Sequence, residues 1–178
     1  FGLLLALALL THTGASAQGG TDEQLAAQYL QQGEYDKAIL YYDKLYKAQP
    51  TDFYYQQLYK SHVALKQYDE AEKLAKEQSR RQNDDPRYLV DIGELKKLQG
   101  DSAKADQQFD KALKNLRPDQ GSIRALANAF TQNNELDYAL ATYERGRKLL
   151  KNDATNFFYE TASIRAAKGD VAGMVSDY

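Results

Sequence analysis

The chain has 178 residues with 23 Lys or Arg against 25 Asp or Glu, a formal net charge of only −2, which lacks the basic surface that nucleic-acid binding needs. It contains no cysteine, and of its two histidines only His62 lies beyond residue 17. Disulfides, cysteine nucleophiles and cysteine or paired-histidine metal sites are therefore excluded, and we expect no nucleic-acid partner, no metal and no cofactor.

Residues 1–10 form an apolar run that is too short to cross a bilayer. The small residues Ala15 and Ala17 follow in the A-x-A spacing that signal peptidase recognises, which places the expected cut before Gln18. The pattern predicts a partial signal peptide over 1–17 and export of the mature chain to the periplasm, the cell envelope or the exterior. An apolar helix packed on the first repeat is the alternative, although the run lacks the polar face of a surface helix. Beyond residue 17 no apolar run approaches the ~20 residues of a membrane span.

A helical pattern begins at Thr21, where apolar residues recur at spacings of three and four. Thr21 or Asp22 can cap this first helix. Gly33 and Glu34 interrupt the pattern, and a second helix runs from Tyr35 towards Pro50. Two antiparallel helices joined by a tight turn make one helical hairpin.

The hairpin returns at intervals of about 34 residues. In the second helix of each copy a small residue is followed four residues later by another core position, and the pairs are Ala38 and Tyr42, Ala71 and Ala75, Ala105 and Phe109, and Ala139 and Tyr143. In the first helix the matching pairs are Leu25 and Ala26, Leu58 and Tyr59, Ile92 and Gly93, and Leu126 and Ala127. Small residues let paired helices approach and large ones fill the gap beyond, so we expect all of these positions in the core.

The turn inside each hairpin carries one residue suited to ending a helix. These residues are Gly33, Lys66, Gly100, Asn134 and Gly169. Gly and Asn suit the left-handed conformation of a helix end, whereas Lys66 does not, which predicts a strained turn in the second hairpin. The prolines of the chain, at positions 50, 86 and 118, all fall between hairpins, where a missing N–H does no harm.

Together these features resemble the tetratricopeptide repeat: the spacing, the Gly33-to-Ala38 turn, the aromatic residue four after the alanine and the closing Pro50. The resemblance implies an all-α, right-handed superhelical solenoid of antiparallel helix hairpins over 18–178. The expected repeats span 19–52, 52–85, 86–119, 120–153 and, incompletely, 154–178. The family's tryptophan is absent from every copy, and no polar closing helix follows the last one, so we expect the chain to be part of a longer protein.

Catalytic chemistry finds little support in the sequence. Asp84 and Asp85 fall in a loop between repeats, and Glu70 and Glu72 fall on a predicted exposed helix face beside Lys73, Arg80 and Arg81. Solvated charge pairs explain these carboxylates better than a general acid and base. His62 lies at a core-facing position and is expected to be partly buried and hydrogen-bonded. No phosphate-binding glycine loop or nucleophile elbow is present, so we expect no enzyme.

Tyrosine is abundant, with 14 residues. Four of them, at positions 29, 42, 143 and 178, occupy repeat-core positions, so packing explains them better than a carbohydrate-binding or protein-binding surface. Tyr159 differs, because its position in a first helix directs it to the inner face of the array.

The resemblance also implies which residues line the concave inner groove, since the first helices face it. These are Gln56, Lys60, Arg87, Val90, Glu94, Arg124, Asn128, Thr131, Tyr159 and Ser163. Arg124 and Asn128 resemble half of the family's carboxylate clamp, but Ser163 stands where the next Asn is required. A solvated face without a ligand is the other interpretation.

The sequence thus predicts a non-catalytic, exported scaffold that binds a protein or peptide partner in the groove, with Arg124, Asn128 and Tyr159 as anchors. The alternative is an amino-terminal structural arm of a larger envelope protein, an assembly, transport or glycan-anchoring factor whose activity lies downstream of Tyr178.

Overall fold

The computed structural model describes residues 14–150 and 157–176, and every regular element in these ranges is an α-helix. The helices are α1 (Gly14–Gln31), α2 (Tyr35–Ala48), α3 (Asp52–Ala64), α4 (Tyr68–Arg81), α5 (Arg87–Leu98), α6 (Ser102–Lys114), α7 (Gln120–Gln132), α8 (Leu136–Leu150), α9 (Phe158–Lys168) and α10 (Val171–Ser176). The predicted all-α class is confirmed. None of the helices in the described residues combines the length and the apolar composition that a membrane span requires.

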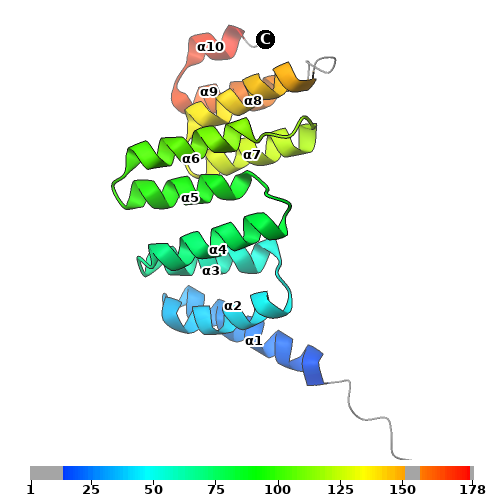
Figure 1. Ribbon diagram of the computed structural model, residues 1–178, viewed down its shortest axis with the longest axis vertical. Helices are drawn as coiled ribbons and strands as arrows, with labels where there is room; N and C mark the ends of the chain where they lie inside the picture. The colour runs from blue at the N-terminus through cyan, green and yellow to red at the C-terminus, as the bar shows by residue number, and fades with distance from the viewer. Residues whose placement is uncertain (1–13, 151–156, 177–178) are drawn as a thin grey trace, which may run out of the picture. The chain divides into compact units, whose positions relative to one another are not determined.

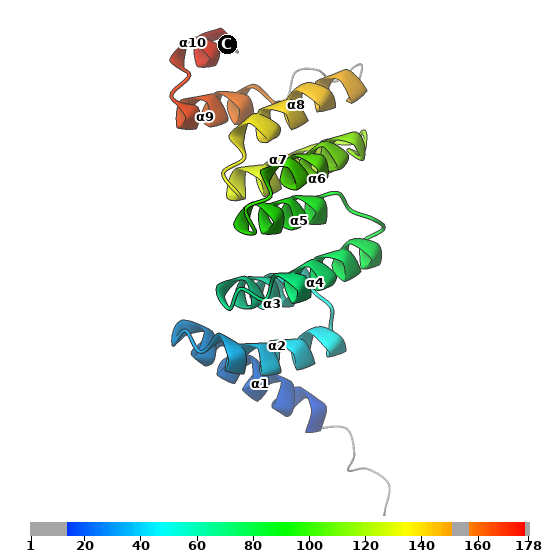
Figure 2. The same cartoon turned by 60° about the vertical axis from the view of Figure 1, so that its left-hand side comes forward.

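The chain divides into two compact units, Phe1–Gln67 and Tyr68–Tyr178. Within the first unit α1 packs on α2, and α2 packs on α3. Within the second unit α5 pairs with α6, α7 with α8 and α9 with α10, while α4 packs on α5 (Figures 1 and 2). Helices of successive hairpins in this unit also touch, α5 with α7 and α6 with α8. The second unit is therefore a stack of hairpins, as the sequence predicted.

Helix α1 begins earlier than predicted. It starts at Gly14, so Thr21 and Asp22 lie inside the helix and the predicted capping role for them is wrong. Asp22 has another function: it is only 8% exposed, and its carboxylate forms an ion pair with Lys44 of α2 at 2.5 Å. Residues 1–13 lie outside the described residues, and the predicted signal peptide stays a prediction.

The repeat-core positions are buried as predicted, except that Leu25 is half-buried. The four alanines at 38, 71, 105 and 139 are 0% exposed, and the residues four positions later are at most 2% exposed. The core of the second unit consists of Val90, Ala105, Phe109, Ala112, Leu116, Ile123, Leu126, Ala127, Phe130, Ala139, Tyr143, Phe157 and Ile164. Gly93 shows why small residues are needed, because a Cβ there would lie 2.1 Å from the Phe109 ring. Small and large residues thus fit each other across α5 and α6.

All five hairpin turns place the predicted residue at positive φ. The glycines 33, 100 and 169 have φ of 73°, 82° and 76°, Asn134 has 59°, and Lys66 has 57°. A side chain in this region clashes with its own backbone, so the strain predicted at Lys66 is confirmed. The loop between α4 and α5 holds two further left-handed residues, Asn83 and Asp84, both at 55°, which the sequence did not predict.

The prolines lie where predicted: Pro50 and Pro118 fall between helices, and Pro86 is the N-cap of α5. The division into five repeats stays a prediction, because residues 151–156 lie outside the described residues and the helices of the second hairpin belong to different units.

Candidate functional site

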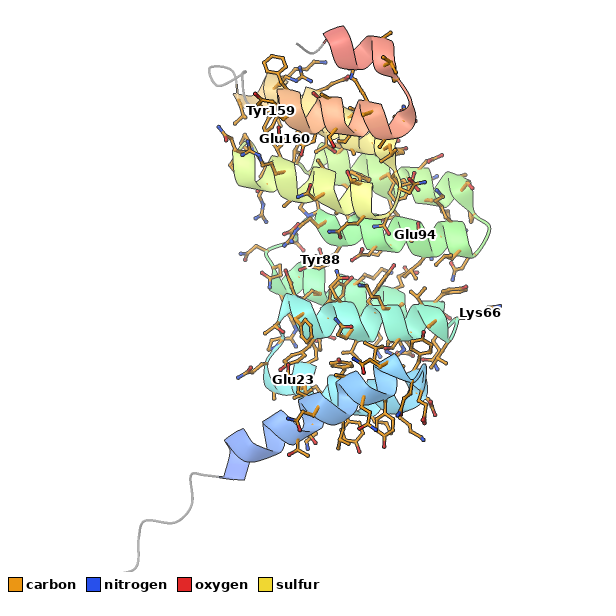
Figure 3. The ribbon with its side chains drawn as sticks, turned by 180° about the vertical axis from the view of Figure 1, so that it is seen from behind. Glu23, Lys66, Tyr88, Glu94, Tyr159 and Glu160 are labelled. Atoms are coloured by element: carbon orange, nitrogen blue, oxygen red, sulfur yellow. The ribbon has the colours of Figure 1, made fainter. Side chains whose placement is uncertain are left out.

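The predicted groove residues fall in both units. Gln56 and Lys60 lie on α3 of the first unit. The others lie on α5, α7 and α9 of the second unit. They form a half-buried to exposed surface, the α5–α7–α9 face, which consists of Arg87, Glu94, Arg124, Asn128, Thr131, Tyr159 and Ser163. Figure 3 shows this side of the unit, with Glu94 on α5 and Tyr159 and Glu160 on α9. Val90 is the exception, because it is 0% exposed and belongs to the core, so its predicted position in the groove is wrong. The apolar, β-branched side chain of Val90 packs in the core of the second unit and does not face the groove.

Arg87 opens the face at the start of α5. Its Nε donates to Asp85 Oδ2 at 2.9 Å, and its backbone N–H donates to Asp85 Oδ1 at 2.9 Å. Its guanidinium lies over the ring of Tyr88, 5.6 Å from the centroid. Asp85 therefore fixes the first turn of α5, which agrees with a structural rather than a catalytic carboxylate, although its partner is Arg87 and not Arg80 or Arg81.

A recess of about 360 Å³ adjoins Arg87 between the loops that precede α5 and α7. Its lining comprises Asp85, Pro86, Arg87, Arg117, Asp119, Gly121, Ser122 and Ala125. The carboxylate of Asp119 caps α7 by accepting from the backbone N–H of Ser122 at 2.8 Å, and this hydrogen bond lowers the pKa of Asp119. Arg117 donates to the carbonyl of Asn83. The charged groups of the recess are thus engaged in holding the two loops.

Glu94 lies farther along α5 and is half-buried. Burial raises its pKa, the charge of Lys97 opposes the rise, and the charge of Glu135 adds to it. Lys97 itself forms an ion pair with Glu135, just before α8. Among the described residues, no group of three or more His, Asp or Glu is placed to hold a metal ion.

Arg124 of α7 is held on three sides. Its Nε donates to Glu160 Oε1 of α9 at 2.9 Å, and its Nη1 donates to Gln120 Oε1 at 3.1 Å. Its guanidinium lies over the buried ring of Phe157, 5.2 Å from the centroid. The arginine was predicted, but its partners were not. Gln120 lies four residues before it on one helix face and could have been found, whereas Glu160 becomes its neighbour only when α9 packs beside α7.

The other residues of the face, on α7 and α9, differ in exposure and in hydrogen bonding within the chain. Asn128 and Ser163 are exposed. Thr131 is exposed too, but its hydroxyl donates to the carbonyl of Ala127 at 2.9 Å, so one of its hydrogen bonds is satisfied within α7. At the start of α9, Tyr159 is 79% exposed and Phe158 is 40% exposed. Tyr159 is thus an exposed aromatic side chain, and its predicted position in the groove stays a prediction.

The tyrosines predicted for the core are buried in two cases. Tyr42 and Tyr143 are each 2% exposed, and Tyr143 packs on Phe157 with ring centroids 4.9 Å apart. Tyr29 is half-buried and stacks on Tyr41 at 5.7 Å. Tyr178 lies outside the described residues.

Two further predictions concern charged groups away from the face. Glu72 does not lie on an exposed face: its side chain is 17% exposed and forms ion pairs with Lys76 at 2.6 Å and with Lys96 of α5 at 2.5 Å. Burial opposes its ionisation, but the hydrogen bonds from both lysines outweigh burial and lower the pKa of Glu72. His62 is half-buried with Nδ1 at 2.7 Å from Gln67 Oε1, so the expected hydrogen-bonded histidine is confirmed.

No family model matches the chain, and no curated protein matches it in sequence. Solved structures with similar helical arrays include MamA from Desulfovibrio magneticus RS-1, with 10% identity, a TM-score of 0.47 and 90% of each chain covered. A tetratricopeptide repeat protein from Thermus thermophilus has 22% identity and a TM-score of 0.44 over 83% of this chain and 81% of the other. One from Parabacteroides merdae has 14% identity and a TM-score of 0.47 over 93% of this chain and 65% of the other.

These similarities are too low to indicate a partner. Within each unit the hairpins themselves are informative: consecutive helices pack on each other, the turns have a left-handed residue, and alanines alternate with large side chains in the core. The chain has, in fold, the architecture of a tetratricopeptide-repeat array.

Proposed function

We propose that the protein is a non-catalytic scaffold that binds a segment of another protein on the α5–α7–α9 face. The observation that carries the proposal is the combination of exposed Tyr159 and half-exposed Arg124 above a fully packed core. In that core Leu126, Ala127 and Phe130 of α7 are 0% exposed. Side chains held on a rigid base lose little conformational freedom on binding, which favours affinity.

The charges of the face support binding rather than catalysis. Arg87 is bound to Asp85, and Arg124 is bound to Glu160. A general acid or base needs a group whose proton can be exchanged with a substrate. Groups that are occupied in holding helices and loops together serve to shape a surface instead.

Site-specific photo-crosslinking in the native cell tests the proposal. A photoreactive amino acid is placed in turn at Arg124 and Tyr159, with Lys73, an exposed residue of α4, as control. We expect a discrete adduct from both test positions and none from position 73, and mass spectrometry of the adduct identifies the partner. If neither position gives an adduct, the face is not the binding surface, and the structural arm becomes the better hypothesis.

We further propose that the protein is exported. The apolar run of residues 1–10 and the small residues Ala15 and Ala17 support this proposal. Mass spectrometry of the protein purified from its native cell measures the mature amino terminus. A chain that starts at Gln18 agrees with export, whereas a chain that retains residues 1–17 contradicts it.

A further inference from the structure

We infer that the first unit carries a binding site of its own, the aromatic–acidic patch, which takes an arginine side chain of a protein partner. The patch consists of Glu23 of α1 and of Phe53 and Tyr54 of α3, and none of these residues belongs to the α5–α7–α9 face. The inference therefore goes beyond the proposed function and does not depend on it. It commits the patch to one kind of ligand, a protein segment with an exposed arginine.

Glu23 is an exposed carboxylate on α1. Its neighbour in the sequence is used by the fold, because Asp22 is 8% exposed and forms an ion pair with Lys44 of α2 at 2.5 Å. Within residues 14–150 and 157–176, the Glu23 side chain forms neither an ion pair nor a hydrogen bond. Figure 3 shows Glu23 on α1, on the side of the first unit where α3 also faces the viewer. Of two adjacent carboxylates, helix packing thus pairs one and leaves the other available.

Three aromatic rings pack together at the start of α3. Between ring centroids, Tyr42 lies 6.4 Å from Phe53 and 6.3 Å from Tyr54, and the Phe53 and Tyr54 rings are 5.5 Å apart. Tyr42 is 2% exposed, Tyr54 is half-buried, and Phe53 remains 52% exposed. The buried tyrosine is therefore a base that holds the two outer rings in place, and Phe53 presents a ring surface to solvent.

The Glu23 carboxylate lies close enough to these rings for its charge to act on their hydroxyl groups. Burial is the main cause that raises the pKa of Tyr42 and of Tyr54, and the negative charge of Glu23 raises both pKa values further. No lysine or arginine of the described ranges opposes this effect at either hydroxyl. The patch is therefore a negatively charged and partly aromatic surface, and its electrostatic complement is a cation.

An arginine side chain matches both parts of the patch. Its guanidinium is planar and carries a fork of N–H donors, so its edge can pair with the Glu23 carboxylate while its flat face stacks on the exposed ring of Phe53. The ion pair and the cation–π contact are each weak at an exposed site, but one guanidinium makes both at once. A lysine ammonium lacks the flat surface, and an acidic side chain would be repelled by Glu23.

Selection from a phage-displayed library of random peptides tests the inference on the full chain. Peptides that bind the Glu23→Gln variant are removed first, so that only peptides that need the Glu23 charge are selected. We expect the selected peptides to share an arginine. For one of them, fluorescence anisotropy measures the Kd of matched versions with lysine or citrulline at that position. Citrulline keeps the shape of arginine without its charge and should weaken binding by about tenfold, and lysine by about threefold.

Variants of the protein assign the arginine to the patch. Phe53→Ala removes the exposed ring and should weaken the arginine peptide by about threefold. In Glu23→Gln the arginine and citrulline peptides should bind almost equally, because the charge that distinguishes them is gone. Two control variants should leave the Kd unchanged. Glu70→Gln removes an exposed carboxylate of the other unit, and Leu40→Ala removes an apolar side chain of α2 that is 70% exposed.

Three outcomes would overturn the inference. The first is a selection that yields no peptide or only peptides without arginine. The second is a preference for arginine over citrulline that persists in Glu23→Gln. The third is an arginine peptide that binds Phe53→Ala as tightly as the unmodified chain, since the site would then be an ion pair without stacking. The proposed function is judged separately, by crosslinking from Arg124 and Tyr159. Circular dichroism of each variant verifies that its helices are retained.

Discussion

The second and third hairpins carry different residues at equivalent buried positions. At the two equivalent core positions the third hairpin has Gly93 in its first helix and Phe109 in its second, and the second hairpin has Tyr59 and Ala75. Gly93 and Phe109 are buried, and so are Tyr59 and Ala75, at 8% and 0% exposure. In the third hairpin the larger residue lies on the second helix, α6, and in the second hairpin it lies on the first helix, α3. Tyr59 departs from the repeat pattern of small residues, and Ala75 departs from the pattern of large ones.

The turns of the two hairpins differ in residue type but share one backbone conformation. Lys66 and Gly100 both have positive φ, 57° and 82°, although only glycine adopts it without strain. The hairpin geometry thus imposes the backbone conformation even where the residue disfavours it. The left-handed residue therefore keeps its place in each turn, while the size of the buried side chains differs from hairpin to hairpin.

The packing of the two buried positions can be tested by introducing the residue types of the second hairpin into the third. Phe109→Ala should destabilise the protein by about 3–5 kcal/mol, because it leaves a cavity beside Phe130, whose ring centroid is 5.6 Å away. Gly93→Tyr should be destabilising too, because even a Cβ at position 93 would lie 2.1 Å from the Phe109 ring. In the double variant the new tyrosine side chain can occupy the space that the Phe109 ring leaves, so the double variant should cost clearly less than the sum.

Urea unfolding of the single and double variants measures this coupling. Ala127→Gly combined with Phe109→Ala provides a control pair that changes size without reproducing an exchange. If the costs of Gly93→Tyr and Phe109→Ala simply add, the side chains at positions 93 and 109 do not compete for one space in the core.

The turns allow a matched comparison of smaller size. Lys66→Gly should stabilise the protein by about 1 kcal/mol, because it relieves the left-handed strain. Gly100→Lys should destabilise it by a similar amount. Asn134→Gly, at φ 59°, should change stability less than Lys66→Gly does, since Asn tolerates this conformation. Thermal unfolding measures all three.

Amide exchange examines the same turn without a substitution. We expect faster exchange over residues 55–82, around Lys66, than over 86–115, around Gly100, because a strained turn opens more readily. Equal protection of the two segments would show that the strain is not transmitted to the helices, and Lys66→Gly would then leave exchange unchanged.

Much of this architecture could be predicted from the sequence because it depends on local rules. The spacing of Ala38 and its equivalents, the turn residues and the prolines all reflect constraints that act within one hairpin. The start of α1 was missed because Asp22 resembles a cap, and only the packing of α2 shows that it binds Lys44. Val90 was misplaced because a regular spacing of groove positions ignores which side chains are apolar.

The candidate site was predictable in its positions but not in its electrostatics. Arg87, Arg124 and Tyr159 could be located by counting along the first helices. That Arg124 is bound to Glu160 of another helix depends on the register between α7 and α9, which a single sequence does not contain.

The smallest expected effect on stability concerns two carboxylates of the neighbouring helices α4 and α5, whose pKa values are shifted in opposite directions. Glu72, paired with Lys76 and Lys96, has a pKa below the usual 4.5, while burial raises the pKa of Glu94 above it. The lowered pKa of Glu72 stabilises the folded state above pH 4.5, and this stabilisation is lost as the pH falls through the pKa of the folded state. The raised pKa of Glu94 destabilises the folded state as the pH rises above 4.5. Glu72→Gln should therefore lose about 0.5–1 kcal/mol at about pH 7 and Glu94→Gln should gain a few tenths. Both differences should fade below about pH 4, and urea unfolding at about pH 7 and about pH 3.5 measures them. A loss of stability at neutral pH in both variants would mean that Glu94 makes a favourable contact that outweighs its burial.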